Sequence, residues 1–347
     1  MTLDPAAAAR PVPASTGAAE RPRVAVVVPA HAPSEELRQA VTALAACDPP
    51  ADELVVVVDG GDPAVERLVA PLVDRVLVRE GRGGPAAARN DGAAVTTAEI
   101  LYFVDSDVVV PRDAIRQLQE HFAARPHVDA VIGSYDDDPP AGGVASRYKN
   151  LLNHHVHQTA KRGAETFWGA CGAVRRRAFE RVDGFDERYT RPCIEDIELG
   201  YRMRAAGSRI EVLHTLQVTH LKRWTARGMV TADVRDRAVP WSELILDGHG
   251  FIDDLNVSRV QRLKVTIACA TVVAALAGVA GVRPARPAAA VGLATSAALD
   301  ARLLRFFADK GGRRFALGAG AWHWLSYLYS AAAFAFVVSR RVLTGPR

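Results

Sequence analysis

Cysteine is scarce in this chain, and its spacing argues against a disulfide-rich domain and against a zinc-stabilised one. Only four cysteines occur among 347 residues, and none belongs to a CxxC pair or to a Cys/His spacing typical of zinc sites. We therefore expect neither a disulfide framework nor a structural zinc, but reduced and mostly buried thiols. A basic stripe interleaved with aromatic residues is also missing, which argues against a nucleic-acid partner.

Long apolar runs are absent from the first 262 residues. The first short run, residues 24–30, follows a polar arm rich in proline and alanine and is too short for a signal peptide. Residues 1–22 are predicted to be a disordered leader. The whole chain is 49% hydrophobic and 24% charged, which is an ordinary globular composition, and its length allows about two domains.

Charge is distributed unevenly, and the C-terminal part combines basicity with apolar runs. From residue 263 onward there are eleven Lys/Arg and two Asp/Glu, whereas the preceding residues hold 32 basic and 37 acidic side chains. Residues 263–282 contain Lys264 as their only charge, and residues 315–338 contain none. Both runs are long enough to cross a hydrocarbon core of about 30 Å. The pattern predicts a membrane anchor over 263–347, with spans near 263–282 and 315–338.

The sequence leaves a third span near 287–305 open. Its apolar part, 287–299, is too short to cross alone, so 287–305 is either a third span or a helix lying in the interface. Three spans would place the basic stretch at 302–314 in the cytoplasm, where such stretches concentrate. We therefore expect a multi-pass protein of the bacterial inner membrane with a cytoplasmic N-terminal domain. Residues 226–262 are predicted to be an amphipathic interfacial segment, with Trp241 at the headgroup boundary.

The N-terminal part alternates between strand and helix patterns. β-Branched apolar runs predict strands, and residues with helical spacing predict helices between them. The predicted strands cover 23–28, 53–58, 73–78 and 100–104, and the predicted helices cover 34–46 and 84–98. This order predicts an α/β fold, a mostly parallel sheet with helices on both faces. Ligands of such sheets bind beyond the carboxyl ends of the strands.

Carboxylates follow two of these predicted strands. The strand at 53–58 leads to Asp59, and the strand at 100–104 leads to Asp105 and Asp107. Where the chain turns at a strand end, both members of the Asp105-x-Asp107 pair can reach one Mg²⁺ or Mn²⁺ that also holds substrate phosphates. The alternative is a pair of turn carboxylates that cap the next element. The arrangement suits a site in which Asp59 reads a nucleoside and the pair neutralises a leaving diphosphate.

Four motifs stand at or near the ends of the predicted elements: residues 26–31 (VVVPAH), 56–62 (VVVDGGD), 88–92 (ARNDG) and 103–107 (FVDSD). Their order and rough spacing resemble those of the family 2 glycosyltransferases of GT-A fold. Residues 184–187 (GFDE) and 194–202 (IEDIELGYR) then resemble the acceptor-side segment of that family. The resemblance covers about residues 23–225, or six-tenths of the chain, and the combination of motifs is far more specific than any single one.

The resemblance implies inverting transfer from a nucleotide-diphosphate sugar, expected to be a UDP-sugar, with a divalent cation as cofactor. It implies Asp196 as the base that deprotonates an acceptor hydroxyl, and Glu195 as a residue that orients the acceptor or nearby backbone. The alternative is that both only cap the start of a helix. The donor-binding residues expected from the motifs are Pro29, His31, Asp59, Arg89 and Asp105, and the metal ligands are Asp105 and Asp107.

Residues 220–224 (HLKRW) resemble the Gln-x-x-Arg-Trp motif of the cellulose and hyaluronan synthase branch. The resemblance implies that Arg223 faces the donor diphosphate and that Trp224 floors the acceptor sugar. His220 stands where that branch has glutamine, which puts processive synthesis in doubt. His220 is expected to be either a third metal ligand or a hydrogen-bonding structural histidine.

Two further segments contain aromatic or imidazole side chains for which the sequence allows both a functional and a structural role. Residues 167–172 (FWGACG) resemble the segment that shapes the acceptor pocket, where Gly169 lets the backbone approach the sugar. Trp168 is there either a stacking platform for the sugar or a core residue. His154 and His157 share a helix face, but no carboxylate or cysteine nearby completes a metal site, and a polar interfacial helix is favoured.

The sequence therefore predicts a membrane-anchored inverting glycosyltransferase with a lipid-linked or polysaccharide acceptor. Two alternatives remain open. A polyprenyl-phosphate sugar synthase would use the same donor site with a phosphate nucleophile. A non-catalytic membrane scaffold that binds nucleotide sugars would retain the fold without turnover.

Overall fold

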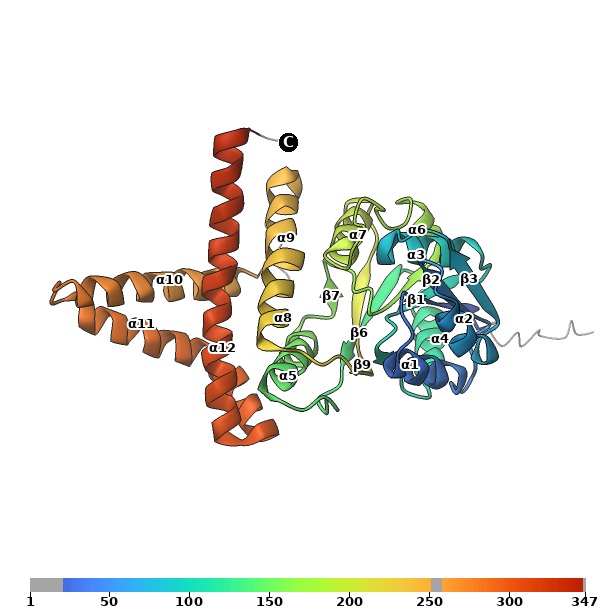
Figure 1. Ribbon diagram of the computed structural model, residues 1–347, viewed down its shortest axis with the longest axis horizontal. Helices are drawn as coiled ribbons and strands as arrows, with labels where there is room; N and C mark the ends of the chain where they lie inside the picture. Colours follow the sequence, from blue (N-terminus) through green and yellow to red (C-terminus); the bar gives the residue numbers. More distant parts are fainter. Residues whose placement is uncertain (1–20, 251–257, 346–347) are drawn as a thin grey trace, which may run out of the picture.

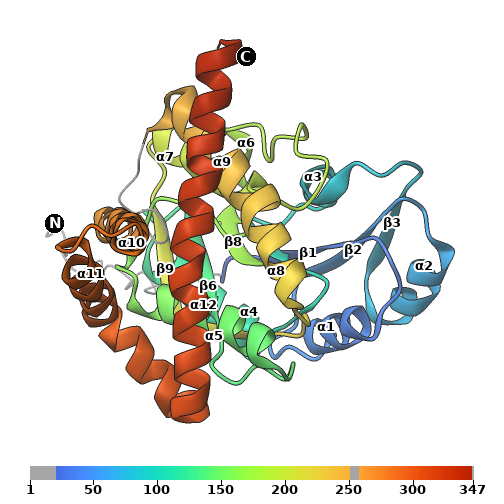
Figure 2. The same ribbon diagram turned by 60° about the vertical axis from the view of Figure 1, so that its left-hand side comes forward.

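The computed structural model describes residues 21–250 and 258–345, which form an α/β domain and a helical C-terminal part (Figure 1). The predicted disordered leader at 1–22 lies almost entirely outside the described residues. The helical part stands against one side of the domain, so the sheet is flanked by helices that follow it in sequence (Figures 1 and 2).

One mixed sheet, in the order β3-β2-β1-β4-β8-β6-β9-β5, forms the centre of the domain. Its strands are β1 (Val24–Ala30), β2 (Glu53–Asp59), β3 (Arg75–Arg79), β4 (Ile100–Val104), β5 (Val108–Val109), β6 (Ala130–Tyr135), β7 (Gly163–Ala164), β8 (Cys171–Arg175) and β9 (Ile210–His220). The four predicted strands are confirmed, and they pair with one another in parallel. β6 and β9 form a further parallel pair. β8 runs antiparallel between β4 and β6, and β5 and β7 pair antiparallel with β9. The GT-A resemblance implies a mixed, mostly parallel sheet, and the sheet is mixed. Its antiparallel pairs all involve strands beyond residue 104, which the sequence pattern did not reveal, and they are as many as the parallel pairs.

Helices cover both faces of the sheet, as predicted. They are α1 (Glu35–Ala45), α2 (Pro63–Val69), η1 (Ala70–Leu72), α3 (Gly84–Ala94), α4 (Ala114–Ala124), α5 (Val144–Thr159), α6 (Arg176–Glu180) and α7 (Glu195–Ala205). Ser34 caps α1 by accepting a hydrogen bond from the Leu37 amide at 3.0 Å. Alternate residues of β1 enter two separate apolar clusters: Val26 packs on one face of the sheet, and Val27 packs on the other. Burial on both faces explains the unbroken apolar runs in the sequence.

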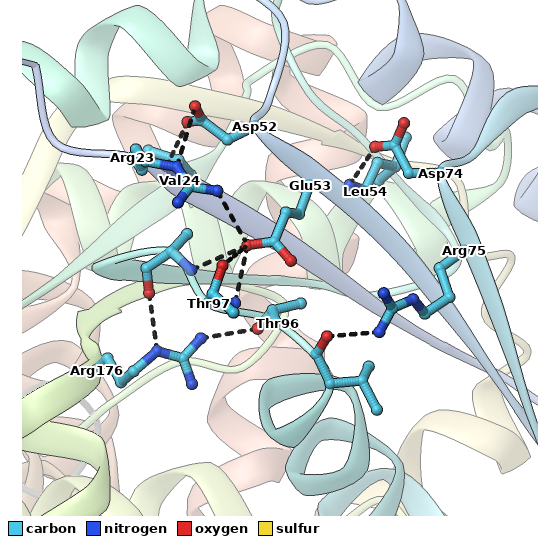
Figure 3. Close-up of polar contacts among 12 residues, drawn as sticks. Arg23, Val24, Asp52, Glu53, Leu54, Asp74, Arg75, Thr96, Thr97 and Arg176 are labelled. Carbon is cyan, nitrogen blue, oxygen red and sulfur yellow. Dashed lines mark hydrogen bonds and ion pairs between the residues drawn. The ribbon is translucent and has the colours of Figure 1, made fainter.

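Carboxylates at the amino ends of the strands accept hydrogen bonds from backbone amides (Figure 3). Asp52 accepts from the Val24 amide and Asp74 accepts from the Leu54 amide, both at 2.7 Å. Glu53 accepts at 2.8 and 2.9 Å from the amides that lead into β4. These bonds satisfy backbone groups at the strand starts, so the acidic residues of this edge have structural partners. The carboxylates at the opposite, carboxyl edge are the candidates for chemistry.

After β9 the chain forms a segment that we name the strap, residues 226–249. It consists of α8 (Ala226–Thr231), the π-helical η2 (Ala232–Ala238), α9 (Val239–Leu244) and the π-helical η3 (Ile245–His249). The strap lies between the sheet domain and α12 (Ala301–Thr344), which is kinked at Gly312 and ends the described chain (Figure 1). α10 (Arg259–Val279) and α11 (Ala285–Leu299) pack side by side and project away from the domain, crosswise to α12 (Figures 1 and 2).

The prediction of several membrane spans is not supported. Among the described residues, only α10 is long and apolar enough to cross a membrane. The predicted span at 315–338 lies within α12, where His323 and several Trp and Tyr residues lower the mean hydropathy. The possible span near 287–305 is interrupted, because α11 ends at Leu299 and α12 begins at Ala301.

Several α12 side chains have partners within the protein. His323 Nδ1 lies 3.0 Å from the Tyr148 hydroxyl of α5, and its Nε2 lies 2.9 Å from the hydroxyl of Tyr327. Tyr327 also donates to Asp300, whose carboxylate accepts from Lys264 of α10 at 2.7 Å. α12 is thus packed against the domain over part of its length. Run length alone does not distinguish such a helix from one that faces lipid on all sides.

Trp241, predicted at the headgroup boundary, has partners within the protein, and its interfacial position stays a prediction. It packs against a small apolar cluster that includes Ile194 and Leu244, and its indole N–H donates to the Tyr201 hydroxyl of α7 at 2.9 Å. Its polar atom therefore has a partner on the α/β domain.

Candidate active site

The carboxyl ends of the strands bring together many of the predicted site residues. Asp105 and Asp107 follow β4, and His220 ends β9. Glu195 and Asp196 open α7, and Arg89 lies in α3, which packs against β1 and β2. The residues come from four separate elements, so the sheet topology assembles a site that is dispersed over more than a hundred residues of sequence.

Arg89 joins two of the carboxylates at the base of this site. Its guanidinium is buried, donating to Asp105 Oδ1 at 2.6 Å and to Glu195 Oε1 at 3.0 Å. The sequence suggested that Arg89 meets a donor phosphate. In the structure it is an ion-pair partner of both carboxylates, and such charge-assisted bonds are strong and directional. Burial raises the pKa of Asp105, although the positive charge of Arg89 opposes the rise.

Asp196 lies in the first turn of α7, as the sequence predicted. Its Oδ2 accepts from the Gly169 amide at 2.9 Å, and its Oδ1 accepts from the Ile197 amide at 2.8 Å. Burial, and then the neighbouring negative charge of Glu195, raise the pKa of Asp196 to about 6. A carboxylate with a pKa in this range can accept a proton near neutral pH and release it again. Glu195 itself is oriented by the Cys193 amide, from which its Oε2 accepts at 2.8 Å.

Asp107 faces the imidazole of His220. His220 Nε2 lies 3.5 Å from Asp107 Oδ2, and His220 Nδ1 lies 2.7 Å from Asn150 Oδ1. An amide oxygen only accepts, so Nδ1 carries a proton and Nε2 is the nitrogen that faces Asp107. Nε2 donates to Asp107 when the ring is protonated and presents a lone pair when the ring is neutral. Burial opposes ionisation of Asp107, but the hydrogen bond and charge of His220, with the charge of Lys222, lower its pKa.

The relationship between Asp107 and His220 suits a cation. Two acceptors at this separation repel one another unless a proton or a positive ion lies between them, and both are ordinary ligands of divalent metals. The third predicted ligand, Asp105, has one oxygen bonded to Arg89. Within the described residues no three His, Cys, Asp or Glu side chains are grouped closely enough to hold a metal. The residues present therefore fit a cation that is held by Asp107 and His220 and completed by substrate oxygens.

Asp59 ends β2 with both carboxylate oxygens engaged. Oδ1 accepts from the Gly83 amide at 2.8 Å, Oδ2 accepts from the Gly84 amide at 2.9 Å, and Arg79 Nε lies 3.3 Å away. Asp59 thereby fixes the turn that starts α3, a structural role that the sequence did not indicate. Gly84 has a φ of +84°, and a Cβ there would lie 2.4 Å from the Thr190 backbone, so this turn requires glycine.

The remaining donor residues, Pro29 and His31, lie at and just beyond the end of β1, where Pro29 is the residue before the last of the strand and His31 is exposed. Both are at the carboxyl edge, next to the ends of β2 and β4. Their predicted role in donor binding stays a prediction.

Trp168 and Gly169 line the other side of Asp196. The Trp168 ring contacts Tyr135 and His157 edge to face, with ring centroids 4.8 and 4.6 Å apart. A Cβ at residue 169 would come within 3.0 Å of the Arg89 guanidinium. Gly169 thus allows its own amide to reach Asp196 while Arg89 passes behind it. Trp168 is half-buried and wedged between rings, so it is held in one orientation.

Arg223 and Trp224 lie in the loop between β9 and α8. Arg223 is exposed. Trp224 packs on the cluster formed by Tyr148, Phe307 and neighbours, and its amide donates to Ser146 Oγ at 2.7 Å. Trp224 is therefore built into the contact between α5 and α12, and its predicted role as a floor for the acceptor sugar stays a prediction.

Two residues of this site were missed by sequence reasoning. Tyr135 ends β6 and stacks on His220, with ring centroids 4.4 Å apart and ring planes at 7°. Asn150 is buried in α5 and fixes the tautomer of His220. The strand pattern of 130–135 could have located Tyr135. Nothing in the sequence around Asn150 distinguishes it from other polar residues of an amphipathic helix.

Comparison with known proteins agrees with this architecture. Residues 25–183 match the glycosyl transferase family 2 profile, and residues 152–224 match the profile described as the N-terminal domain of galactosyltransferase. The pre-mycofactocin glycosyltransferase of Mycobacterium tuberculosis is 31% identical in an alignment of 218 residues that covers 59% of this chain and 45% of that protein. The O-antigen biosynthesis protein RfbC of Myxococcus xanthus is 28% identical in an alignment of 221 residues that covers 57% of this chain and 17% of that protein.

A solved structure resembles nearly the whole chain. It is the mannosyltransferase PcManGT from Pyrobaculum calidifontis, in complex with GDP-Man and Mn²⁺; the TM-score is 0.58 at 23% identity, over 92% of this chain and 88% of that one. This likeness establishes the GT-A-like fold. The chain spans less than half the length of the two curated relatives described above. From the matched profile and the named relatives, residues 25–183 form a family 2 glycosyltransferase domain.

Proposed function

We propose that the protein transfers a sugar, with inversion, from a nucleotide-diphosphate donor to a hydroxyl of a membrane-associated acceptor. Asp196 is the base in this proposal. The observation that carries it is the setting of Asp196: it is held by the Gly169 and Ile197 amides, and burial beside Glu195 raises its pKa to about 6. A carboxylate fixed in place with this basicity suits removal of one proton from a hydroxyl.

The proposed reaction is a single displacement. The acceptor oxygen forms a bond to the anomeric carbon as the bond from that carbon to the donor diphosphate breaks, and the electron pair leaves with the nucleoside diphosphate. The hydroxyl proton passes to a carboxylate oxygen of Asp196. Trp168 and Gly169 form the wall beside Asp196 against which we place the acceptor sugar, and Asp59 borders the nucleotide side.

A divalent cation, Mg²⁺ or Mn²⁺, fits between Asp107 and His220, and when bound it supplies positive charge to the departing diphosphate. The protein groups prepare that position. Asn150 holds the His220 ring, and Tyr135 stacks on its face, so Nε2 remains aimed at Asp107. The solved relative that contains GDP-Man and Mn²⁺ supports the assignment by analogy of fold.

The helical C-terminal part supports a membrane location, which we propose to be the cytoplasmic face of the bacterial inner membrane. α10 has the length and composition of a span. Large apolar side chains along α10 and α11 are exposed, among them Val273 at 67%, Leu276 at 65% and Val291 at 65%. Exposed apolar area of this extent is typical of surfaces that contact lipid or protein. A membrane location favours a lipid-linked or polysaccharide acceptor, because both partners are then confined to one surface.

Nucleotide binding tests the donor half of the proposal. UDP, GDP and dTDP are titrated by calorimetry into the detergent-solubilised protein, with and without Mn²⁺. The Asp107→Asn variant removes the proposed ligand, and Asp113→Asn, an exposed position at the start of α4, is the matched control. We expect Mn²⁺-dependent binding of one nucleotide that is lost only in Asp107→Asn. If the wild-type protein binds none of the three nucleotides, the proposal is wrong.

Replacement of Asp196 separates this function from a polyprenyl-phosphate sugar synthase. A phosphate nucleophile is already ionised and needs no strong base, whereas a hydroxyl does. Asp196→Asn should therefore reduce transfer by about 10²-fold or more while nucleotide binding is retained. Near-normal turnover in Asp196→Asn would favour the synthase, and tight nucleotide binding without turnover on any acceptor would favour the scaffold.

A further inference from the structure

The strap is fastened at two points to opposite sides of the candidate site. Asp233 of η2 forms an ion pair with Lys149 of α5 at 2.5 Å and accepts from the Tyr329 hydroxyl of α12 at 2.8 Å. Eight residues further on, Trp241 donates to Tyr201 of α7 at 2.9 Å. The strap therefore bridges from α5 to α7, and α7 is the helix that begins with Glu195 and Asp196 (Figure 1).

Arg237 lies midway between these two fastening points. Residues four apart lie on the same side of a helix, so this spacing places Arg237 on the face that carries Asp233 and Trp241, which are bonded to α5 and α7. Its side chain is exposed, and it has no carboxylate within ion-pair distance among the residues that the structure describes. The neighbouring Arg235 differs, because its guanidinium is bonded to Asp236 at 2.8 Å.

The electrostatic surroundings agree with this orientation. Burial and then Glu195 raise the pKa of Asp196, whereas the positive charge of Arg237 is among the influences that oppose the rise. The same charge acts on Tyr135, at the metal side of the site, and on His157 and Lys149 of α5. Arg237 is thus close enough to interact with groups on both sides of the gap. Among residues 21–250 and 258–345, Arg237 is therefore a cation beside an acidic site with no carboxylate within ion-pair distance.

We propose that Arg237 binds a phosphate group of a substrate at the gap between α5 and α7, next to Asp196. A guanidinium presents donors in a planar fork that matches phosphate oxygens, and it stays charged at every physiological pH. Two substrates can supply this phosphate: the diphosphate of the donor, or a phosphate that links the acceptor to its lipid. The strap contacts α12 through Asp233, which places Arg237 on the side of the helical C-terminal part and favours the acceptor. This inference rests on the proposed function.

Binding measurements with matched variants test the proposal. Arg237→Ala removes the free guanidinium, Arg235→Ala removes a paired one from the same segment, and Arg237→Lys keeps the charge without the fork. Each variant is titrated with the nucleotide that the wild-type protein binds, in the presence of Mn²⁺. Each is also incubated with vesicles of neutral lipid with or without polyprenyl phosphate, and the excess binding caused by the phosphate lipid is recorded.

We expect Arg237→Ala to lose at least about tenfold in one of the two affinities, which is the scale of one charge-assisted hydrogen bond. Arg237→Lys should recover part of the loss, and Arg235→Ala should bind as the wild type does. A loss confined to nucleotide identifies the donor phosphate, and a loss confined to the phosphate lipid identifies the acceptor. If Arg237→Ala matches Arg235→Ala with both probes, the proposal is overturned. Because Asp107→Asn tests the metal-dependent nucleotide site separately, failure here leaves the proposed function standing.

Discussion

The imidazole of His220 lies with Nε2 3.5 Å from Oδ2 of Asp107. The two groups come from the ends of β9 and from the loop after β4, and the antiparallel pairing of Val108 with His220 sets their register. Asn150 holds the opposite nitrogen of the ring. The backbone of the sheet therefore determines the separation of the two proposed ligands, and one buried amide determines which nitrogen faces the carboxylate.

Removal of Asn150 should weaken metal-dependent nucleotide binding. Partners that orient a metal-binding histidine typically contribute 10–100-fold to metal affinity, so Asn150→Ala should raise the apparent Kd for nucleotide by about that factor when Mn²⁺ is limiting. Calorimetry over a range of Mn²⁺ concentrations measures the change. Asn153→Ala, on the same helix, is the matched control. An equal loss with and without Mn²⁺ would show that Asn150 acts on the fold and not on the metal position.

The activity of the protein should depend on pH through Asp196. The carboxylate must be ionised to accept a proton, and burial beside Glu195 raises its pKa to about 6. Transfer should therefore fall as the pH decreases below about 6, and the acidic limb should disappear in Asp196→Asn along with most of the rate. Initial rates at saturating donor, measured between pH 5 and 8 at constant ionic strength, provide the profile. A wild-type rate that is flat down to pH 5 would contradict the role of base.

Asp196 should also affect the pH dependence of the free energy of unfolding. Its effect has the opposite sign from that of an ordinary ion-paired carboxylate, because its pKa is raised and not lowered in the folded protein. The folded protein binds the Asp196 proton more tightly than the unfolded chain does, so this group destabilises the folded protein above about pH 6 and ceases to do so below about pH 4. The difference amounts to at most about 3 kcal/mol. Asp196→Asn should therefore gain stability relative to wild type as the pH rises from 4 to 7. Urea denaturation at a series of pH values measures this difference.

The first half of the sheet was predictable from the sequence because three of its four strands, β1, β2 and β4, are buried on both faces. Their apolar runs are unbroken, and the carboxylates stand at or directly after their ends, so the strands and the positions of Asp59, Asp105 and Asp107 followed from pattern alone. The second half of the sheet was not predictable in this way. β8 is a run of small residues (Cys171–Arg175), and its pairing with β4 and β6 depends on contacts distant in sequence.

The candidate site shows the same division. Asp196 was placed correctly at the start of a helix, because acidic residues before a helical pattern mark a helix N-terminus. The double ion pair of Arg89 could not be inferred, because its two carboxylate partners are 16 and 106 residues away. Spans were overestimated for a related reason. The sequence shows how apolar a helix is but not whether the α/β domain covers it. The Tyr148 hydroxyl of the domain, for example, contacts His323 of α12.

Loss of Arg89 should be among the most destabilising single changes in the domain. Arg89→Ala leaves Glu195 buried without its ionic partner and Asp105 without a counter-charge. Removal of one partner from a buried ion pair typically costs about 3–5 kcal/mol. Arg89→Lys should recover little, because a single ammonium cannot span both carboxylates as the fork does. Urea denaturation gives the free energy of unfolding, and Arg82→Ala, at an exposed arginine seven residues earlier, should change it by less than about 0.5 kcal/mol.

Charges on the exposed face of α10 should release the protein from membranes. Val273 and Leu276 are 67% and 65% exposed, and their replacement by aspartate would place two carboxylates in the proposed hydrocarbon region. Each such charge costs about 3 kcal/mol in the middle of a span, so the double variant should bind liposomes at least a hundredfold more weakly. Flotation with vesicles of phosphatidylethanolamine and phosphatidylglycerol measures the bound fraction. The matched control is Val78→Asp, an equally apolar and 43% exposed position on β3 of the α/β domain. Unchanged flotation of the α10 variant would mean that this helix packs against protein, and the membrane location would then have to be abandoned as an explanation of its exposed face.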